Sequence, residues 1–220
     1  MTSRRHAAVA GLGSALPERI VPNSYFESLV DTSDEWIRDR TGIRERRFAL
    51  DDQTTSDLAT GAAVKALDSA GLSAEQVDML IVATLTPDNP IPAAAVRVQS
   101  KLGISCPAFD LNAACAGFSY AMSAGAAFIE SGNAETVVVM GAEVLSRVLD
   151  YTDRTTCILF GDGAGAVVLR PADAPGILGS VLGADGTAAD ILIIPAGGSA
   201  SPASHDTVEQ IGRASCRERV

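Results

Sequence analysis

Apolar residues occur along the chain in two patterns, short continuous runs and longer stretches in which they recur every three or four positions. The short runs are rich in β-branched residues, and they predict strands over residues 7–16, 77–84, 135–142, 157–160 and 164–169. The recurring pattern predicts helices over residues 23–30, 31–41, 54–70, 92–102, 112–132 and 143–149. Because strands and helices alternate, we expect an α/β fold with a mixed sheet that is covered by helices.

Polar and glycine residues mark where some of these elements begin and end. Asn23 is a predicted N-cap, residues 54–57 open the first long helix, and Gly71 ends it. The glycine-rich stretch 161–165 is interpreted as a tight turn between two strands.

The chain is predicted to contain one half of a repeated fold and the start of another. Residues 1–173 form the first half. After a polar break, residues 176–184 predict a strand whose rhythm resembles that of residues 8–16, so residues 174–210 are interpreted as the start of a second copy. The last ten residues, 211–220, fit neither a strand nor a helix pattern and are expected to be a non-native tail.

Composition and charge narrow the class of protein. The 220 residues are 47% hydrophobic and 20% charged, which is typical of globular proteins. A formal charge of −10 argues against a nucleic-acid partner, because such binding needs basic residues that neutralise phosphates. The sequence has no run of about 18 apolar residues, so no membrane span is expected. The four cysteines form no C-x-x-C pair, so we expect no metal, no disulfide framework and a reduced, cytoplasmic setting.

Cys115 is the candidate nucleophile. It follows a short apolar run that ends at Leu111, and it lies near the start of the helix predicted over residues 112–132. A helix N-terminus carries partial positive charge and favours a thiolate over a thiol. Its small neighbours, Ala114 and Ala116, leave room for a substrate to reach the sulfur. The alternative is a buried structural cysteine, since free cysteine is among the most buried residue types.

A basic cluster lies beside the single tryptophan, Trp36. Five arginines fall between residues 38 and 47. Such a run is usually a solvated face. A tryptophan beside arginines is also a combination that holds a flat ring and a phosphate together.

Six motifs resemble the β-ketoacyl-acyl-carrier-protein synthase III family in their order and spacing. They are DTSDEW at 31–36, RTGIRER at 40–46, CPAFD at 106–110, AACAGF at 113–118, TDR at 152–154 and FGDGAG at 160–165. The resemblance covers residues 9–196. It implies a thiolase fold, in which two similar βαβ-rich halves form a layered α-β-α-β-α sandwich, and a homodimer.

The resemblance also implies a reaction. In the family a cysteine thiolate takes the acyl group from an acyl-CoA, and the acyl-enzyme is condensed with malonyl-acyl-carrier protein, with loss of carbon dioxide, in fatty acid synthesis. The matching nucleophile is Cys115, and backbone N–H groups would hold the oxyanion. Trp36 and Arg154 match the positions that hold the CoA adenine, with Thr32 and Arg40 at the same end. Acyl-CoA is a substrate here, and no cofactor is expected.

Three further residues match the acyl pocket of the family. Ile91 occupies the position that closes the pocket of the partner subunit, often as Phe, and its smaller side chain is expected to widen the pocket. Leu145 and Phe160 are expected to line the same pocket, with ordinary core packing as the alternative.

The sequence departs from the family at the residues that assist condensation. The family pairs its cysteine with a His and an Asn, whereas His6 and His205 match no catalytic motif. We therefore expect an incomplete second half, and a 220-residue polypeptide that is poorly soluble and inactive in condensation.

Three other functions remain open at this point. The first is an acyltransferase or starter-unit enzyme of secondary metabolism that resembles the same family. The second is a non-catalytic thiolase-fold subunit, against which the retained Cys115 argues. The third, a nucleotide-binding domain with residues 161–165 as phosphate loop, is disfavoured because these glycines precede no helix.

Overall fold

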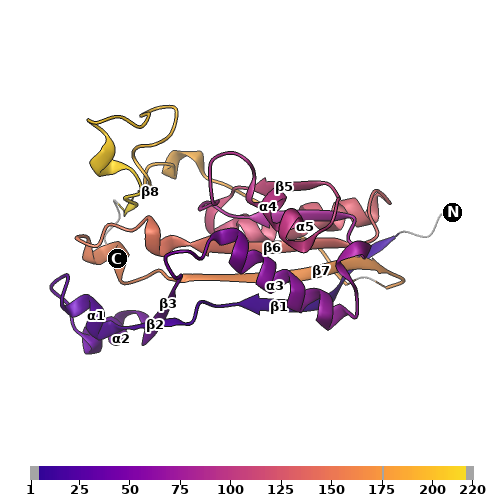
Figure 1. Cartoon of the computed structure of the whole chain (residues 1–220), viewed down its shortest axis with the longest axis horizontal. Helices are drawn as coiled ribbons and strands as arrows, with labels where there is room; N and C mark the ends of the chain where they lie inside the picture. Colours follow the sequence, from indigo (N-terminus) through magenta and orange to yellow (C-terminus); the bar gives the residue numbers. More distant parts are fainter. Residues whose placement is uncertain (1–4, 175, 217–220) are drawn as a thin grey trace. The chain divides into compact units, whose positions relative to one another are not determined.

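The structure is a computed structural model, and it describes residues 5–174 and 176–216 (Figure 1). Two compact units emerge, each assembled from three separate stretches of chain. The first unit comprises Met1–Leu16, Asp51–Glu143 and Gly163–Leu182, and the second comprises Pro17–Leu50, Val144–Asp162 and Gly183–Val220. Of the sequence predictions, the first four residues of the N-terminal half and the last four of the tail lie outside the described residues. The boundaries at residues 173 and 210 stay predictions.

The first unit contains the central sheet and its helices. The strands are β1 (His6–Ala15), β4 (Met79–Ala83), β5 (Ala108–Leu111), β6 (Val137–Val144) and β7 (Asp162–Ala172), of which β6 and β7 each extend one residue into the second unit. The helices are α3 (Thr55–Ala70), α4 (Ala94–Leu102), α5 (Gly117–Glu130) and the short 3₁₀ helices η1 (Ala74–Gln76) and η2 (Ala114–Ala116).

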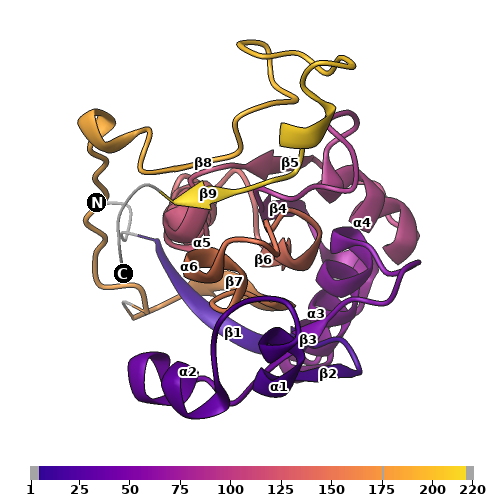
Figure 2. The same cartoon turned by 90° about the vertical axis from the view of Figure 1, so that its left-hand side faces the viewer.

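The five strands lie in the order β1-β7-β6-β4-β5. Strand β4 is parallel to β5 and β6, whereas β1 is antiparallel to β7, so the predicted mixed sheet is confirmed. Figure 2 shows α5 on one side of the strands, and α3 with α4 on the other. A sheet covered on both faces has apolar residues at every position, and all five residues of β4 are buried.

Close packing of α3 on β1 depends on two glycines. A Cβ atom at Gly11 or Gly13 would overlap the backbone of α3, with the carbonyl oxygens of Ala66 and Ala62 as the nearest atoms. The ends of α3 are those predicted. Thr54 and Asp57 form a reciprocal capping box, and Gly71 ends the helix at a positive φ of 67°.

The second unit contains smaller elements. They are β2 (Arg19–Pro22), α1 (Asn23–Glu27), α2 (Asp34–Thr41), β3 (Glu45–Phe48), η3 (Leu145–Arg147), α6 (Arg154–Cys157), η4 (Gly186–Ala188), β8 (Leu192–Ile193), η5 (Val208–Gln210) and β9 (Ser215–Cys216). Strands β2 and β3 pair antiparallel, as do β8 and β9.

The core of this unit encloses an arginine from the basic cluster. Phe26, Ile37 and Phe48 are buried together. The Arg46 guanidinium lies 4.6 Å from the Phe26 ring centre, its Nε donates to the Ile158 carbonyl at 2.9 Å, and the group also donates to Asn23. Arg46 is therefore a structural residue, and the interpretation of the cluster as a solvated face is wrong at this position.

Five predictions about local structure are wrong. The predicted helix over 143–149 is the end of β6 followed by η3, and residues 157–160 lie at the end of α6 and in the following loop. Glycines 161–165 make no turn between strands, because β7 begins at Asp162 and runs through them. No strand is present over the described residues of 176–184. Asn23 is not an N-cap, because its side chain donates instead to Asp34 and to the Ile43 carbonyl.

Candidate active site

Cys115 lies in an exposed turn between β5 and α5. It belongs to η2 and lies two residues before Gly117, the first residue of α5, so the predicted position at a helix start is confirmed, and the cysteine is not buried. The residue before it, Ala114, has a positive φ of 46°. Such a conformation costs an L-residue about 1–2 kcal/mol, and it persists only where the surroundings fix it.

The ends of the Cys115 turn rest on neighbouring strands. The Thr84 N–H, at the end of β4, donates to the carbonyl of Leu111 at 3.2 Å. At the other end of the turn, a Cβ atom at Gly117 would lie 3.3 Å from that of Ala83. The Phe118 ring lies over β6, where a Cβ atom at Gly141 would be 3.2 Å from it.

Two carboxylates organise this carboxyl-terminal edge of the parallel strands. Asp110 accepts hydrogen bonds from the first backbone N–H groups of α4, at Ala94 (2.7 Å) and Ala95 (2.8 Å). Glu143, near the end of β6, accepts from the N–H groups of Leu85 (2.9 Å) and Thr86 (3.1 Å). Asp110 therefore fixes the start of α4, and Glu143 fixes the segment that follows β4.

The other cysteines with described side chains differ from Cys115 in burial. Cys157 is fully buried, and burial, together with Asp153, raises the pKa of its thiol to about 11. Cys106 is half-buried, and burial, together with Asp78, raises its pKa above the usual range. Both thiols are therefore poor nucleophiles near neutral pH.

In the second unit, Trp36 is flanked by two guanidinium groups. The Cζ atom of Arg154 lies 4.8 Å from a Trp36 ring centre, and that of Arg40 lies 5.6 Å away. A hydrogen bond of 2.7 Å from Arg154 to the carbonyl of Asp31 fixes the first group. Asp153 caps α6 by accepting from the Thr155 N–H, so Arg154 is held at a helix start. The sequence prediction that these residues lie together is confirmed.

The remaining predicted site residues lie in both units. Thr32, near this cluster in sequence, has a hydroxyl that is buried without a partner among the described residues. Leu145 begins η3 and Phe160 precedes β7, and both are half-buried. Ile91, in the loop between β4 and α4 of the first unit, has an exposed fraction of 86%.

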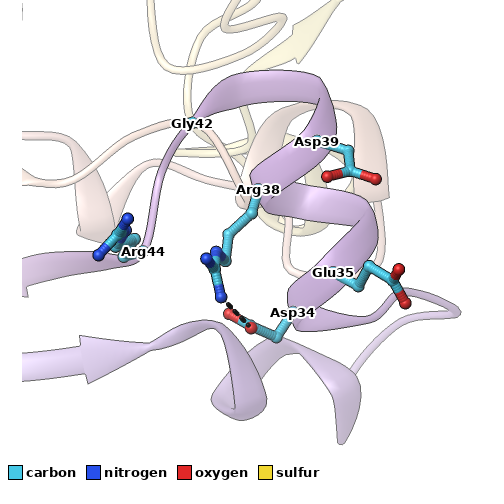
Figure 3. Close-up of a pocket in the computed structure, with 6 residues that line it drawn as sticks. All are labelled: Asp34, Glu35, Arg38, Asp39, Gly42 and Arg44. Carbon is cyan, nitrogen blue, oxygen red and sulfur yellow. Dashed lines mark hydrogen bonds and ion pairs between the residues drawn. The ribbon is translucent and has the colours of Figure 1, made fainter.

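Two further arginines of the basic cluster, Arg38 and Arg44, line a hollow of mixed charge. Its volume is about 340 Å³, and Figure 3 shows the residues that line it, Asp34, Glu35, Arg38, Asp39, Gly42 and Arg44. Arg38 pairs with Asp34 at 3.4 Å, and a hydrogen bond from Asn23, followed by Arg38 itself, lowers the pKa of the Asp34 carboxyl. These arginines are balanced by acids, so the hollow is no concentrated positive site.

Within the described ranges, no three His, Cys, Asp or Glu side chains are grouped as a metal site would require. No helix among those described is both long and apolar enough to cross a membrane.

Comparison with known proteins assigns a family to this arrangement. The sequence profile for 3-oxoacyl-[acyl-carrier-protein (ACP)] synthase III matches residues 109–186, the segment that contains Cys115. The β-ketoacyl-[acyl-carrier-protein] synthase III of Xanthomonas campestris (strain 8004) is 53% identical over 198 residues, which are 90% of this chain and 61% of that protein. The chain belongs to the β-ketoacyl-[acyl-carrier-protein] synthase III family. It spans about 61% of the length of that relative.

Solved structures of synthase III proteins confirm the predicted thiolase fold. The synthase III of Thermus thermophilus superposes with a TM-score of 0.86 at 42% identity, over 96% of this chain and 65% of that one. The priming β-ketosynthase of the R1128 polyketide biosynthetic pathway superposes with a TM-score of 0.82 at 40% identity, over 88% of this chain and 58% of that one.

Sequence reasoning missed Ala114 and Glu143 as parts of this synthase III site. Ala114 could not be identified from the sequence, because nothing about an alanine indicates that its φ is positive. Glu143 was assigned to a helix, although an acid at the carboxyl end of a buried strand is a signal that could have identified it.

Proposed function

We propose that Cys115 takes the acyl group from an acyl-CoA, and that the whole protein condenses it with malonyl-acyl-carrier protein in fatty acid synthesis. The observation that carries this proposal is the exposed Cys115 in a strained turn at the start of α5. A buried packing cysteine would need neither the exposure nor the strain. Relatives named β-ketoacyl-[acyl-carrier-protein] synthase III support the choice of reaction.

The first step follows from the chemistry of a thiolate. The sulfur of Cys115 attacks the thioester carbonyl carbon, the bond from that carbon to the CoA sulfur breaks, and the CoA thiolate leaves and takes up a proton. Backbone N–H groups near the cysteine are proposed to hold the oxyanion that forms in between. No electron donor or acceptor is required.

Other residues are proposed to bind the same substrate. Trp36, Arg40 and Arg154, with Thr32, would hold the nucleotide end of CoA, since a ring between an indole and guanidinium groups is stabilised by stacking and by charge. Leu145 and Phe160 are proposed to line the acyl pocket, and Ile91 is proposed to close the acyl pocket of the partner subunit.

We also propose a cytoplasmic homodimer that uses no cofactor. Support comes from the family and from the free thiols of Cys106, Cys115 and Cys157. Light scattering during size-exclusion chromatography tests the dimer.

A second candidate is a starter-unit enzyme of secondary metabolism. The similarity to the priming β-ketosynthase of a polyketide pathway favours it. The two functions share the acylation of Cys115 and differ in the acyl group and the acceptor.

Acyl-enzyme trapping tests the proposal. The protein is incubated with acetyl-CoA or with branched and longer acyl-CoAs, and its intact mass is measured. We expect an adduct of one acyl group on Cys115, absent from C115A and retained in the control C106A. Absence of any adduct with all acyl-CoAs would favour a non-catalytic subunit instead.

Adding malonyl-acyl-carrier protein or alternative acceptors to the acyl-enzyme of the whole protein distinguishes the two candidates. A 3-oxoacyl-carrier-protein product supports fatty acid synthesis, whereas transfer to another acceptor supports the second function.

A further inference from the structure

Glu143 is a partly buried carboxylate for which the proposed chemistry has no use. It lies on β6, two residues beyond Gly141, which pairs with Ala83 of β4. Burial raises the pKa of its carboxyl, although four hydrogen-bond donors oppose the effect. Burying a carboxylate costs free energy of folding. Such a residue is expected where its hydrogen bonds hold a segment that the protein needs in place.

The segment that Glu143 fixes directly follows β4. Its carboxylate accepts from the N–H groups of Leu85 and Thr86, from the Thr84 hydroxyl at 3.3 Å, and from the Thr86 hydroxyl. The Thr86 N–H is shared with the Thr84 hydroxyl, at 3.1 Å. Three consecutive residues are thus held by one side chain.

This segment and the residue before it adjoin both ends of the Cys115 turn. The N–H of Thr84 donates to the Leu111 carbonyl, four residues before the cysteine, and Ala83 lies so near the first residue of α5, Gly117, that a Cβ atom added there would be 3.3 Å from the Ala83 side chain. Between these two supports lies Ala114 at its positive φ. A strained residue relaxes when its surroundings loosen, so the turn keeps its shape only while the end of β4 stays in place.

We propose that Glu143 is a positioning residue for Cys115: its carboxylate fixes residues 84–86, and these hold the strained turn in the geometry that makes the sulfur reactive. This inference rests on the proposed acylation of Cys115. Glu143 itself touches neither the sulfur nor the substrate in this role. Its loss would lower the rate of acylation without changing how CoA is bound, because the CoA residues proposed above lie on other elements.

The test compares E143Q with the matched control E135Q. Gln keeps the shape of Glu143 but replaces one acceptor oxygen with a donor group. Glu135 precedes β6 and forms an exposed ion pair with Arg5. Single-turnover acylation by acetyl-CoA is followed by intact mass. We expect the rate constant at saturating acetyl-CoA to fall at least tenfold in E143Q, while the half-saturating concentration and the final acylated fraction change less than twofold. E135Q should behave as the wild type.

A loss confined to the acylated fraction would indicate misfolding and would overturn the inference, as would an unchanged rate constant. If E143Q does not fold, T86V removes one hydroxyl donor and leaves Glu143 in place, and we expect a fall of about threefold in the rate constant. An unchanged rate in T86V would then count against the role.

Failure of the proposed function gives a different result. If the wild type is not acylated at all, iodoacetamide replaces acetyl-CoA as the probe, since it needs no binding site. The alkylation rate of Cys115 should still fall at least fivefold in E143Q, because a disordered turn no longer holds the sulfur in one exposed position at the start of α5. Equal alkylation rates in both proteins would reject the positioning role independently of the substrate.

Discussion

The guanidinium of Arg154 lies 4.8 Å from a ring centre of Trp36, and it is tied to the Asp31 carbonyl. A flat ring inserted between them would need about 3.5 Å on each side, or roughly 7 Å in all. The proposed stacking of a nucleotide base between the two groups would therefore require Arg154 to move outward by about 2 Å.

Replacing Arg154 with Ala is expected to raise the acyl-CoA concentration that half-saturates acylation of Cys115. A cation–π contact contributes about 1–2 kcal/mol, and 1.4 kcal/mol is a factor of ten, so we expect an increase of about tenfold. The measurement is acylation rate against acyl-CoA concentration. R38A, which removes an exposed ion pair on α2, is the control and should change the value less than twofold. Equal effects of both variants would contradict a specific role for Arg154.

Alkylation by iodoacetamide should distinguish the cysteines at pH 7.5. A raised thiol pKa leaves less thiolate, and burial raises that of Cys157 to about 11, so less than about one thiol in a thousand is ionised there. Cys106 has a raised pKa as well. Peptide mapping over time should therefore show Cys115 modified at least tenfold faster than either. Faster labelling of Cys106 would contradict the assignment of Cys115 as nucleophile.

The Gly13→Ala substitution should destabilise the protein, because the added methyl overlaps the α3 backbone at Ala62. Overpacking of this kind costs about 1–3 kcal/mol, and more when backbone has to move. Urea denaturation measures the loss. The control is G165A in the neighbouring strand β7, where nothing lies within 4 Å of the new Cβ atom. We expect G165A to stay within about 0.5 kcal/mol of the wild type. A stable G13A protein would contradict the close packing of β1 and α3.

Asp57 should contribute stability that disappears in acid. Burial raises the pKa of Asp57, but hydrogen bonds from Lys101 and Thr54 outweigh it and lower the pKa from 3.8 to about 2. A depressed carboxyl pKa stabilises the folded state above pH 4, and this contribution is lost as the pH falls from 4 towards 2. Since the side chain is 41% exposed, solvent screening reduces the contribution to about 1 kcal/mol.

Urea denaturation of D57N at pH 6 and at pH 2.5 tests this dependence. The variant should be less stable than the wild type at pH 6, and the difference should shrink at pH 2.5. D68N, at an exposed position on the same helix, serves as the control. A difference that does not depend on pH would assign the effect to the lost helix cap alone.

The sequence predicted elements well where local chemistry decides them. The helix from Thr55 to Ala70 was predicted with both ends, because the Thr54–Asp57 capping box and Gly71 act within a few residues. The position of Cys115 at a helix start was predicted from the residues around it, and Trp36 and Arg154 were singled out by motifs that resemble a family. Their geometry, including the positive φ of Ala114, could not be predicted, since it depends on strands distant in sequence.

Errors arose where a long-range contact overrides a local preference. Residues 143–149 have helix-forming composition, but Glu143 is held by Leu85 and Thr86, and the Ser146 N–H donates to Asp162. Gly163 was read as a turn residue, whereas it serves close packing: a Cβ atom there would lie 3.0 Å from the Leu16 side chain. A glycine that relieves crowding and a glycine that makes a turn look the same in a sequence.

The pairing of β1 has a consequence for how the chain acquires its fold. His6 pairs with Ala172 and Ala15 with Ala164, so β1 is synthesised well before its neighbour and cannot pair until β7 has been synthesised. Such high contact order slows folding, and it leaves a strand edge exposed in the nascent chain. Among the strands of this sheet, β1 is thus synthesised first but can join only after β7, and until then its unpaired edge is open to chaperones that bind exposed strands.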